Sequence, residues 1–197
     1  MQAWIFIDFW NFQLSVNDRA SDPSYKLDWE KLSPFLIAET EKIIGSPLEF
    51  NGTNVYLSYD PKKKTDKGLL GWAKNKLARF PGIRVIVKER QTRRPPSCPH
   101  CHQAVTNCPH CGGQMVGTIE KGIDTAIVTD MMRLAWEGVL DVAILASSDR
   151  DFIPAVTCLQ SKSLRVINVL FPPIGAELAN TCWASIDMRP HLPDLSR

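Results

Sequence analysis

The chain has 197 residues, and 44% of them are apolar, which is enough for a single domain with a sizeable core. Glycine and proline together are close to their average share, and no apolar run approaches the ~18–20 residues that a membrane helix needs, so collagen-like, low-complexity and membrane-spanning chains are excluded. The N-terminal stretch has no basic region ahead of its apolar residues, unlike a secretory signal, and we expect a soluble cytoplasmic protein.

The basic residues are distributed unevenly. The formal net charge is only +2, yet the segment from Lys62 to Arg94 holds twelve Lys and Arg against two acids, so the rest of the chain is net acidic. A face that binds a polyanion would give this distribution, and so would a solvated helix face followed by a lysine-rich loop. Charge alone leaves both interpretations open.

Strand-like and helix-like segments alternate along the chain. The apolar run Trp4–Phe9 has the composition of a strand buried on both faces. The spacing of apolar residues predicts a helix over Asp28–Ile44, with Asp28 as its N-cap and Gly45 as its stop. Further strands are predicted over Thr53–Tyr59, Ile83–Glu89, Val142–Ala146 and Leu164–Leu170, and further helices over Gly68–Phe80, Ile123–Trp136, Asp151–Gln160 and Ala176–Trp183. This order predicts an α/β fold with a doubly wound, mainly parallel sheet in a single domain over residues 1–197.

Residues 93–115 interrupt the alternation with a segment rich in Pro, Cys and Gly. The spacing C-x2-C-x6-C-x2-C is formed by Cys98, Cys101, Cys108 and Cys111. Two C-x2-C turns can present four thiolates to one tetrahedral zinc ion, and this pattern in an intracellular chain is more typical of zinc than of disulfides. We therefore predict an inserted zinc-knuckle module. A redox-active dithiol pair is the alternative, because the x6 spacing is short for a zinc ribbon.

Acidic residues follow the predicted strands at one edge of the sheet. Asp8 lies at the end of the first strand, Asp149 follows the strand Val142–Ala146, and Asp124 opens a helix. Parallel α/β sheets bind ligands at the carboxyl ends of their strands, where the strand order reverses. If the two strands are neighbours, these carboxylates come close enough to need a compensating cation, and all-oxygen ligands favour Mg²⁺ or Mn²⁺. Taken singly, each aspartate could instead be a helix N-cap.

Three motifs resemble those of NYN domains, which are PIN-like ribonuclease domains. Ile7-Asp8-Phe9-Trp10-Asn11 resembles the I-D-x-x-N opening of that family, Lys121-Gly122-Ile123-Asp124 resembles its K-G-x-D helix start, and Ser147-Ser148-Asp149-Arg150-Asp151-Phe152 resembles its S-x-D-x-D-F strand exit. The motifs occur in the family's order and span nearly the whole chain, so together they are fairly specific. Two departures are Phe9, where many relatives have Gly, and Arg150, which places a cation between two acids.

The resemblance implies a metal-dependent endoribonuclease. Mg²⁺ or Mn²⁺ would be held by Asp8, Asp124 and Asp149. Asp151 would help to orient metal-bound water, and Asn11 would bind a ligand or brace the acids. Water activated at such a centre would hydrolyse a phosphodiester bond, with single-stranded RNA as the expected substrate.

Basic residues flank the same edge. We predict a nucleic-acid-binding wall made of Lys62, Lys63, Lys64, Arg90, Arg93, Arg94, Lys121 and Arg150. The inserted module leaves and re-enters the domain at the carboxyl edge, so it should stand beside the acids and track an RNA backbone. It could also serve only to staple a long loop. Trp10 and Phe12 are candidates for stacking on bases, although aromatic residues near a strand end are more often in the core.

Other assignments compete with this one. Asp130 also falls where the family often has an acid, but it lies six residues beyond Asp124 and points to a different face of the helix. The alternative function is a weakly active or inactive NYN-like RNA-binding or scaffolding module. A haloacid-dehalogenase-type phosphatase is disfavoured because the second acid of its D-x-D motif is missing after Asp8, and motifs of P-loop NTPases and dinucleotide enzymes are absent. Trp72, Trp136 and Cys158 are expected in the core, and nothing in the sequence indicates an oligomeric state.

Overall fold

The computed structural model describes residues 1–20, 22 and 24–197. Over this part of the chain, six parallel strands form one sheet in the order β3-β2-β1-β6-β7-β8. The strands are β1 (Gln2–Asp8), β2 (Glu49–Tyr59), β3 (Ile83–Glu89), β6 (Val142–Ala146), β7 (Arg165–Leu170) and β8 (Ala184–Asp187). The chain builds outwards from β1 to β3 and then from β6 to β8, so the predicted doubly wound parallel sheet is confirmed.

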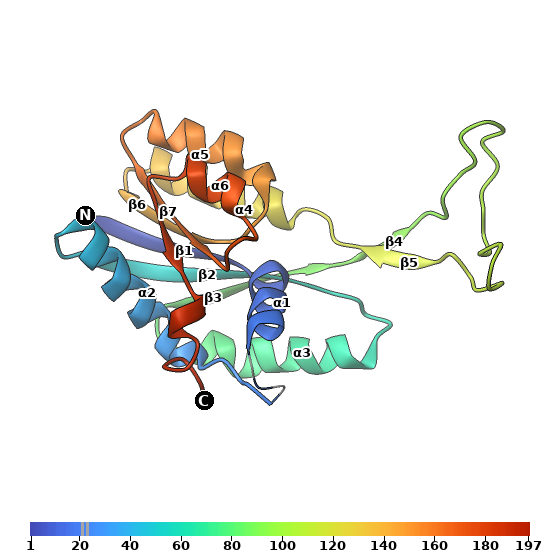
Figure 1. The fold of residues 1–197 in the computed structure, drawn as a ribbon, viewed down its shortest axis with the longest axis horizontal. Coiled ribbons are helices and arrows are strands. Elements are labelled where there is room, and N and C mark those ends of the chain that lie inside the picture. Colours follow the sequence, from blue (N-terminus) through green and yellow to red (C-terminus); the bar gives the residue numbers. More distant parts are fainter. Residues whose placement is uncertain (21, 23) are drawn as a thin grey trace.

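Helices cover both faces of the sheet (Figure 1). One face carries α1 (Phe9–Arg19), α2 (Trp29–Ile44) and α3 (Lys64–Asn75), and the other carries α4 (Ile123–Trp136), α5 (Ile153–Gln160) and α6 (Ala176–Thr181). Short 3-10 turns lie at Leu77–Arg79, Arg150–Phe152 and Arg189–His191. Because alternate side chains of a strand face opposite ways, Ile5 and Ile7 of β1 join the core under α1 and α2, whereas Phe6 joins the core under α4.

The helix predicted from its caps is confirmed as α2. The carboxylate of Asp28 accepts hydrogen bonds from the backbone N–H groups of Glu30 (3.1 Å) and Lys31 (3.4 Å). Gly45 follows the last turn with φ of 75°, a left-handed conformation that glycine adopts without strain. Both ends of α2 are therefore fixed by the local sequence.

Two elements of the main sheet and its helices were not predicted, and neither were the two short strands of the arm described below. α1 begins at Phe9, where the sequence suggested only the end of a strand, and its apolar residues Phe9, Phe12 and Val16 are buried at helical spacing. β8 is a short edge strand directly after α6, and the predicted last helix therefore ends earlier than expected. The other predicted elements are present, with ends that differ by a few residues.

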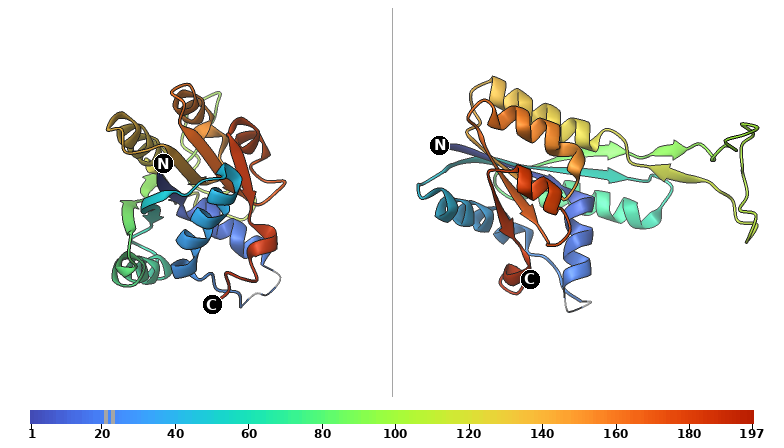
Figure 2. Two further views of the ribbon diagram at one scale, coloured as in Figure 1. Left: turned by 90° about the vertical axis from the view of Figure 1, so that its left-hand side faces the viewer. Right: turned by 45° about the horizontal axis from the view of Figure 1, so that its top comes forward.

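An arm projects from the carboxyl edge of the sheet (Figures 1 and 2). Its stem is an antiparallel pair formed by β4 (Gln91–Arg93) and β5 (Gly117–Ile119). We call residues 91–119 the arm and residues 94–116 its tip. The tip contains the four cysteines of the predicted insert and has no acidic side chain.

Two side chains expected in the core lie at the surface. Trp136, at the end of α4, is 92% exposed, and Cys158 of α5 is also exposed. Helical spacing with aliphatic residues did not place either of them on the buried face, so these two predictions are wrong. Trp72 packs partly against the core as expected. No helix in the described residues is long and apolar enough to cross a membrane.

Candidate functional site

Asp8 is held where two neighbouring strands end. β1 pairs with β6, so the residues that follow both strands meet at the carboxyl edge. The Asp8 side chain is 5% exposed, and its Oδ1 accepts a hydrogen bond from the backbone N–H of Asn11 (3.3 Å) as the N-cap of α1. The hydroxyl of Ser147, the first residue after β6, donates to Asp8 Oδ2 (3.4 Å). The same carboxylate is thus both a helix cap and a buried acid at the edge of the sheet.

The segment after β6, which we call the acidic loop (residues 147–151), is ordered by its own side chains. The backbone N–H of Asp149 donates to Ser147 Oγ (3.2 Å), and the backbone N–H of Asp151 donates to Asp149 Oδ1 (2.9 Å). The backbone N–H of Ser148 donates to Asn11 Oδ1 (2.8 Å). Asn11 therefore contacts Asp8 through its backbone and the acidic loop through its side chain, and its role toward the acids or a ligand stays a prediction.

Burial and repulsion perturb Asp8 strongly. Burial raises its pKa to about 7, against the opposing effect of the hydrogen bond from Asn11, and repulsion from Glu120 and Asp124 adds to the increase. Such a pKa means that the metal-free site favours a proton on Asp8 at acidic pH. A nearby cation would favour the ionised form instead.

Asp124 lies in the first turn of α4 and is more exposed than Asp8. Partial loss of hydration raises its pKa, and repulsion from Asp149, Glu120 and Asp151 acts in the same direction. Asp8 and Asp124 thus interact electrostatically with each other and with three more carboxylates. We call this set the acidic group: Asp8, Glu120, Asp124, Asp149 and Asp151.

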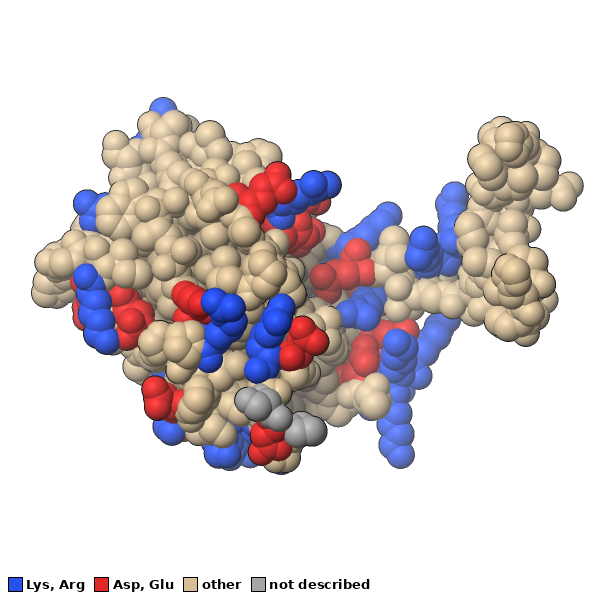
Figure 3. Space-filling model, in the orientation of Figure 1, with Lys and Arg blue, Asp and Glu red and all other residues tan. Residues whose placement is uncertain are grey.

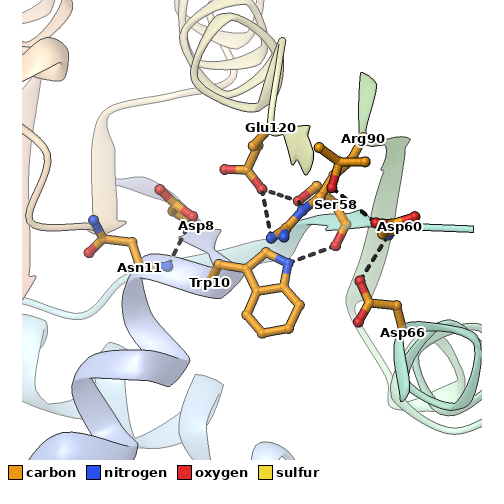
Figure 4. Close-up of polar contacts among 9 residues, drawn as sticks. Asp8, Trp10, Asn11, Ser58, Asp60, Asp66, Arg90 and Glu120 are labelled. Atoms are coloured by element: carbon orange, nitrogen blue, oxygen red, sulfur yellow. Dashed lines mark hydrogen bonds and ion pairs between the residues drawn. The ribbon is translucent and has the colours of Figure 1, made fainter. Parts of the chain in front are cut away.

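Glu120 is the member of the acidic group that the sequence analysis did not single out. It directly follows β5, the strand by which the chain returns from the arm, and therefore lies at the carboxyl edge of the sheet. Its carboxylate accepts a hydrogen bond from the hydroxyl of Ser58 and lies 4.0 Å from the Arg90 guanidinium (Figure 4). The available signal was its position directly before the K-G-x-D motif.

The acidic group is not assembled as a finished metal site. Within the described residues, no three Asp, Glu, His or Cys side chains are arranged so that they could hold an ion. The chemistry of the donors fits Mg²⁺ or Mn²⁺, because all are carboxylate oxygens and their repulsion is what a divalent ion relieves. The side chains would have to draw closer around the ion, so the structure leaves the predicted metal unconfirmed.

The four cysteines of the tip form two similar turns. In the first, the Cys98 N–H donates to Gln103 O (2.8 Å) and the His102 N–H donates to Cys98 O (2.9 Å). In the second, Cys108 and the two glycines that follow Cys111 make the same pair of bonds, at 2.7 and 2.9 Å. Backbone N–H groups directed at the sulfur lower the pKa of Cys98 and of Cys108. All four thiols are free, and no group of three is assembled among the described residues, so zinc binding is not confirmed.

We call Arg90 and Glu120, the residues on either side of the arm, the arm root. Hydrogen bonds and an aromatic contact attach the arm root to the body beside the acidic group. The Arg90 guanidinium lies 5.1 Å from the centre of the Trp10 ring, and its Nε donates to Ser58 Oγ (2.9 Å). Trp10 Nε1 donates to Ser58 O (2.6 Å). These contacts occupy one face and one edge of the indole. Phe12 is 2% exposed and packs in the core, so of its two possible assignments the core assignment holds and base stacking is excluded.

A second tie reaches the stem of the arm. Thr118 of β5 donates to Asp60 Oδ2 (3.1 Å), and the Asp60 N–H donates to Asp66 Oδ2 (2.8 Å). The two sets of contacts hold the arm against the end of β2, the first at Ser58 and the second at Asp60 (Figure 4).

The predicted cations lie around this root. Lys62, Lys63 and Lys64 are exposed where β2 leads into α3, Arg93 and Arg94 are exposed on the arm, and Lys121 and Arg150 are exposed beside the acids. Arg90 differs, because it is half-buried and engaged with Ser58 and Glu120. Figure 3 shows basic side chains gathered where the arm leaves the body, with acidic side chains next to them.

Two other features lie apart from the acidic group. Asp130, the second-ranked acid, accepts a hydrogen bond from Tyr56 (2.7 Å) and lies 3.6 Å from Arg133, so it is engaged in a structural contact. A cavity of about 450 Å³ lies between α1 and α3, with Phe9, Trp29 and Trp72 among its walls. None of the predicted acids lines it.

The sequence was compared with known proteins. The model of the NYN domain matches residues 2–189. No curated protein matches significantly. Among solved structures, the crystal structure of a protein of unknown function from Vibrio parahaemolyticus is similar over 94% of this chain and 91% of that chain, with a TM-score of 0.59 and 18% sequence identity. At that identity the similarity concerns the fold alone.

Proposed function

Because this chain belongs to the NYN domain family, whose members are PIN-like and generally ribonuclease-like, we propose that it is a metal-dependent endoribonuclease that hydrolyses single-stranded RNA. The observation that carries the proposal is the acidic group at the carboxyl edge. Burial and mutual repulsion raise the pKa of Asp8 and of Asp124, which is a cost unless a cation is part of the working site.

Asp8, Asp124 and Asp149 would hold Mg²⁺ or Mn²⁺, with Glu120 beside them. A divalent ion at this position would lower the pKa of a bound water and neutralise the charge that develops on the scissile phosphate. Asn11 keeps Asp8 and the acidic loop together through its two hydrogen bonds. Asp151, exposed next to Asp149, would orient the attacking water.

The cations would hold the RNA backbone. Arg150 pairs with Glu177 at 3.9 Å on the surface, and such an exposed pair is weak enough to be exchanged for a phosphate oxygen. The other exposed members of the predicted wall surround the arm root, so a strand that passes the acidic group would meet positive charge on its way. Phosphate contacts of this kind give affinity without base preference.

Zinc belongs to the proposal as a structural ion of the tip. In each turn the two thiols lie within hydrogen-bonding reach of each other, and backbone N–H groups favour the thiolate at Cys98 and at Cys108. Closing the two turns on one ion with Cys101 and Cys111 would give four sulfur ligands. The ion would order a tip that otherwise has few apolar contacts.

The alternative is an RNA-binding or scaffolding module with little or no turnover. Two observations favour it: the acids are not assembled for a metal ion, and Arg90 lies 4.0 Å from Glu120, where it compensates part of the negative charge. The alternative predicts salt-sensitive RNA binding without cleavage.

Cleavage of labelled RNA and DNA oligomers in Mn²⁺ separates the two functions. The wild-type chain is expected to cut single-stranded RNA, and Asp8→Asn and Asp149→Asn are each expected to lower the rate by about 100-fold or more, since each removes a charge that acts on the reacting centre. Asparagine keeps the cap that each aspartate provides, so the fold is preserved.

The matched control is Asp18→Asn, which removes one exposed carboxylate near the end of α1. Its rate should equal that of the wild type. Full activity in Asp8→Asn or Asp149→Asn would refute the site, and RNA binding without cleavage by the wild type would establish the alternative.

A further inference from the structure

A side chain of β7 is hydrogen-bonded to the start of the acidic loop. Asn168, in the middle of β7, is completely buried, and its side-chain amide donates to Leu145 O (3.1 Å) and to Ser147 O (2.9 Å). The first carbonyl belongs to β6 and the second to the first residue of the acidic loop. One side chain thus uses both of its amide hydrogens to fix the point where the chain leaves the sheet.

The connection from β7 to α6 touches the next residue of the acidic loop. Gly175 has φ of 80°, a conformation that other residues rarely adopt. A Cβ atom at this position would lie 2.8 Å from Ser148 Cβ and 2.9 Å from Ser148 Cα, closer than real Cβ atoms come to another carbon. The backbone of the loop can therefore occupy its place only because residue 175 has no side chain.

Asn11 makes a third contact with the same segment. Its Oδ1 accepts from the Ser148 N–H, while Asn168 binds the carbonyl of Ser147 and Gly175 lies against Ser148. These contacts come from α1, β7 and the loop before α6, and they enclose the two residues that directly precede Asp149. Small displacements here move the Asp149 carboxylate relative to Asp8.

We propose that Asn168 and Gly175 are positioning residues for the metal-holding acids, because the two amide hydrogen bonds and the missing side chain fix the backbone that carries Asp149. The proposal deepens the function proposed above and rests on it for its effect on metal binding. Its effect on the loop itself does not depend on that function.

Gly175→Ala is the sharpest test, with Gly138→Ala as its matched control. Gly138 has φ of 69°, so alanine there meets the same backbone strain, but nothing lies within 4 Å of the added Cβ. Asn168→Leu removes both donors at similar volume. Its control is Asn54→Leu, which removes an equally buried amide from β2 on the other side of the sheet centre.

The first measurement is hydrogen–deuterium exchange in EDTA. The Ser148 amide donates to Asn11 and the Asp149 amide donates to Ser147, and the exchange of both should accelerate in Gly175→Ala and Asn168→Leu but not in the two controls. Removing the Ser148 side chain in the double variant Gly175→Ala/Ser148→Gly should restore part of the protection, because it removes two of the three close contacts. Unchanged exchange in Gly175→Ala would overturn the proposal.

The second measurement is Mn²⁺ binding by calorimetry. Gly175→Ala should bind Mn²⁺ about 10–100-fold more weakly than Gly138→Ala, the range seen when groups that orient metal ligands are removed. Wild-type protein that binds no Mn²⁺ would refute the proposed function while the exchange result still decides the positioning of the loop. Equal Mn²⁺ affinity in Gly175→Ala and Gly138→Ala would refute the positioning role and leave the nuclease proposal intact. If Asn168→Leu fails to fold while Asn54→Leu folds, Gly175→Ala alone decides.

Discussion

At the scale of the residue, the carboxylate of Asp8 combines a structural role with a strongly perturbed pKa. It caps α1 and accepts a hydrogen bond from Ser147. It is buried, and Glu120 and Asp124 repel its negative charge. A cap alone would favour ionisation. The burial that comes with the end of a central strand has the larger effect and raises the pKa.

This pKa has a consequence for stability. Asp8 titrates near 7 in the folded chain and near its ordinary value of 3.8 when unfolded, so the folded chain binds one more proton between these values. The free energy of unfolding of metal-free protein should therefore fall as pH rises from about 4 to about 7, by up to about 4 kcal/mol. Urea unfolding in EDTA at pH 5 and pH 8 measures the part of this change that lies above pH 5, about 3 kcal/mol.

Asp8→Asn is the control for this prediction. Asparagine caps a helix as well as aspartate does but does not titrate, so its stability should be less dependent on pH, and at pH 8 it should exceed that of the wild type without metal. If both proteins lose the same free energy between pH 5 and pH 8, Asp8 is not the responsible group.

Sequence reasoning identified part of the candidate site because some of its residues form local motifs. Asp8, Asp124 and Asp149 were identifiable from strand ends and short spacings. Glu120, Asn168 and Gly175 were not, since their partners Ser58, Ser147 and Ser148 are distant in sequence and become neighbours only when the sheet forms.

At the scale of the element, helices and strands with clear local sequence signals were predicted, and those that depend on tertiary contacts were not. α2 has an aspartate cap and a left-handed glycine at its end, so its bounds follow from short-range chemistry. β8 has only four residues and is stabilised by pairing with β7, which no local pattern reports. Trp136 follows the buried Leu134 by two residues, about 200° around the helix axis, so it faces away from the sheet although its neighbours in α4 still pack on the core.

The arm allows a quantitative prediction about RNA binding. Arg93 and Arg94 are exposed on the stem and at the start of the tip. If each contacts one phosphate, the double variant Arg93→Gln/Arg94→Gln should reduce the slope of log K against log salt by about 1.4, since each contact with a single strand contributes about 0.7.

Fluorescence anisotropy with single-stranded RNA in EDTA, over a range of salt concentrations, measures this slope. Lys42→Gln, which removes an exposed lysine of α2 paired with Glu39, is the control and should leave the slope unchanged. A double variant with the wild-type slope would show that the stem does not touch the backbone of the RNA.

At the scale of the whole molecule, the tip and the sheet are separate in their stability. The core lies between the sheet and its helices, and no residue of the tip belongs to either hydrophobic cluster. Metal in the tip should therefore order the tip without supporting the body.

Zinc analysis tests this division. We expect one zinc ion per chain, lost in the double variant Cys98→Ser/Cys108→Ser. The variant should be cut faster by protease within residues 94–116, while the thermal unfolding midpoint of the body stays within about 2 °C of the wild type, as expected when no core contact changes. Zinc-free wild-type protein with freely alkylated cysteines would refute the knuckle, and a large fall in the midpoint would refute the separation. Cys158→Ser, at an exposed cysteine outside the tip, is the control.

The contacts that anchor the arm to the body limit how the arm can vary. Thr118 is bound to Asp60, Arg90 is bound to Ser58, and Glu120 directly follows the strand that returns from the tip. Lengthening, shortening or replacing the tip leaves these anchors in place, whereas a deletion that reaches the stem removes the Thr118 contact and the strand that positions Glu120 at the edge of the sheet. We therefore expect evolution to have remodelled the outer turns freely while the junction stayed constant, and an engineer who grafts a different recognition module onto this chain should cut between residues 94 and 116.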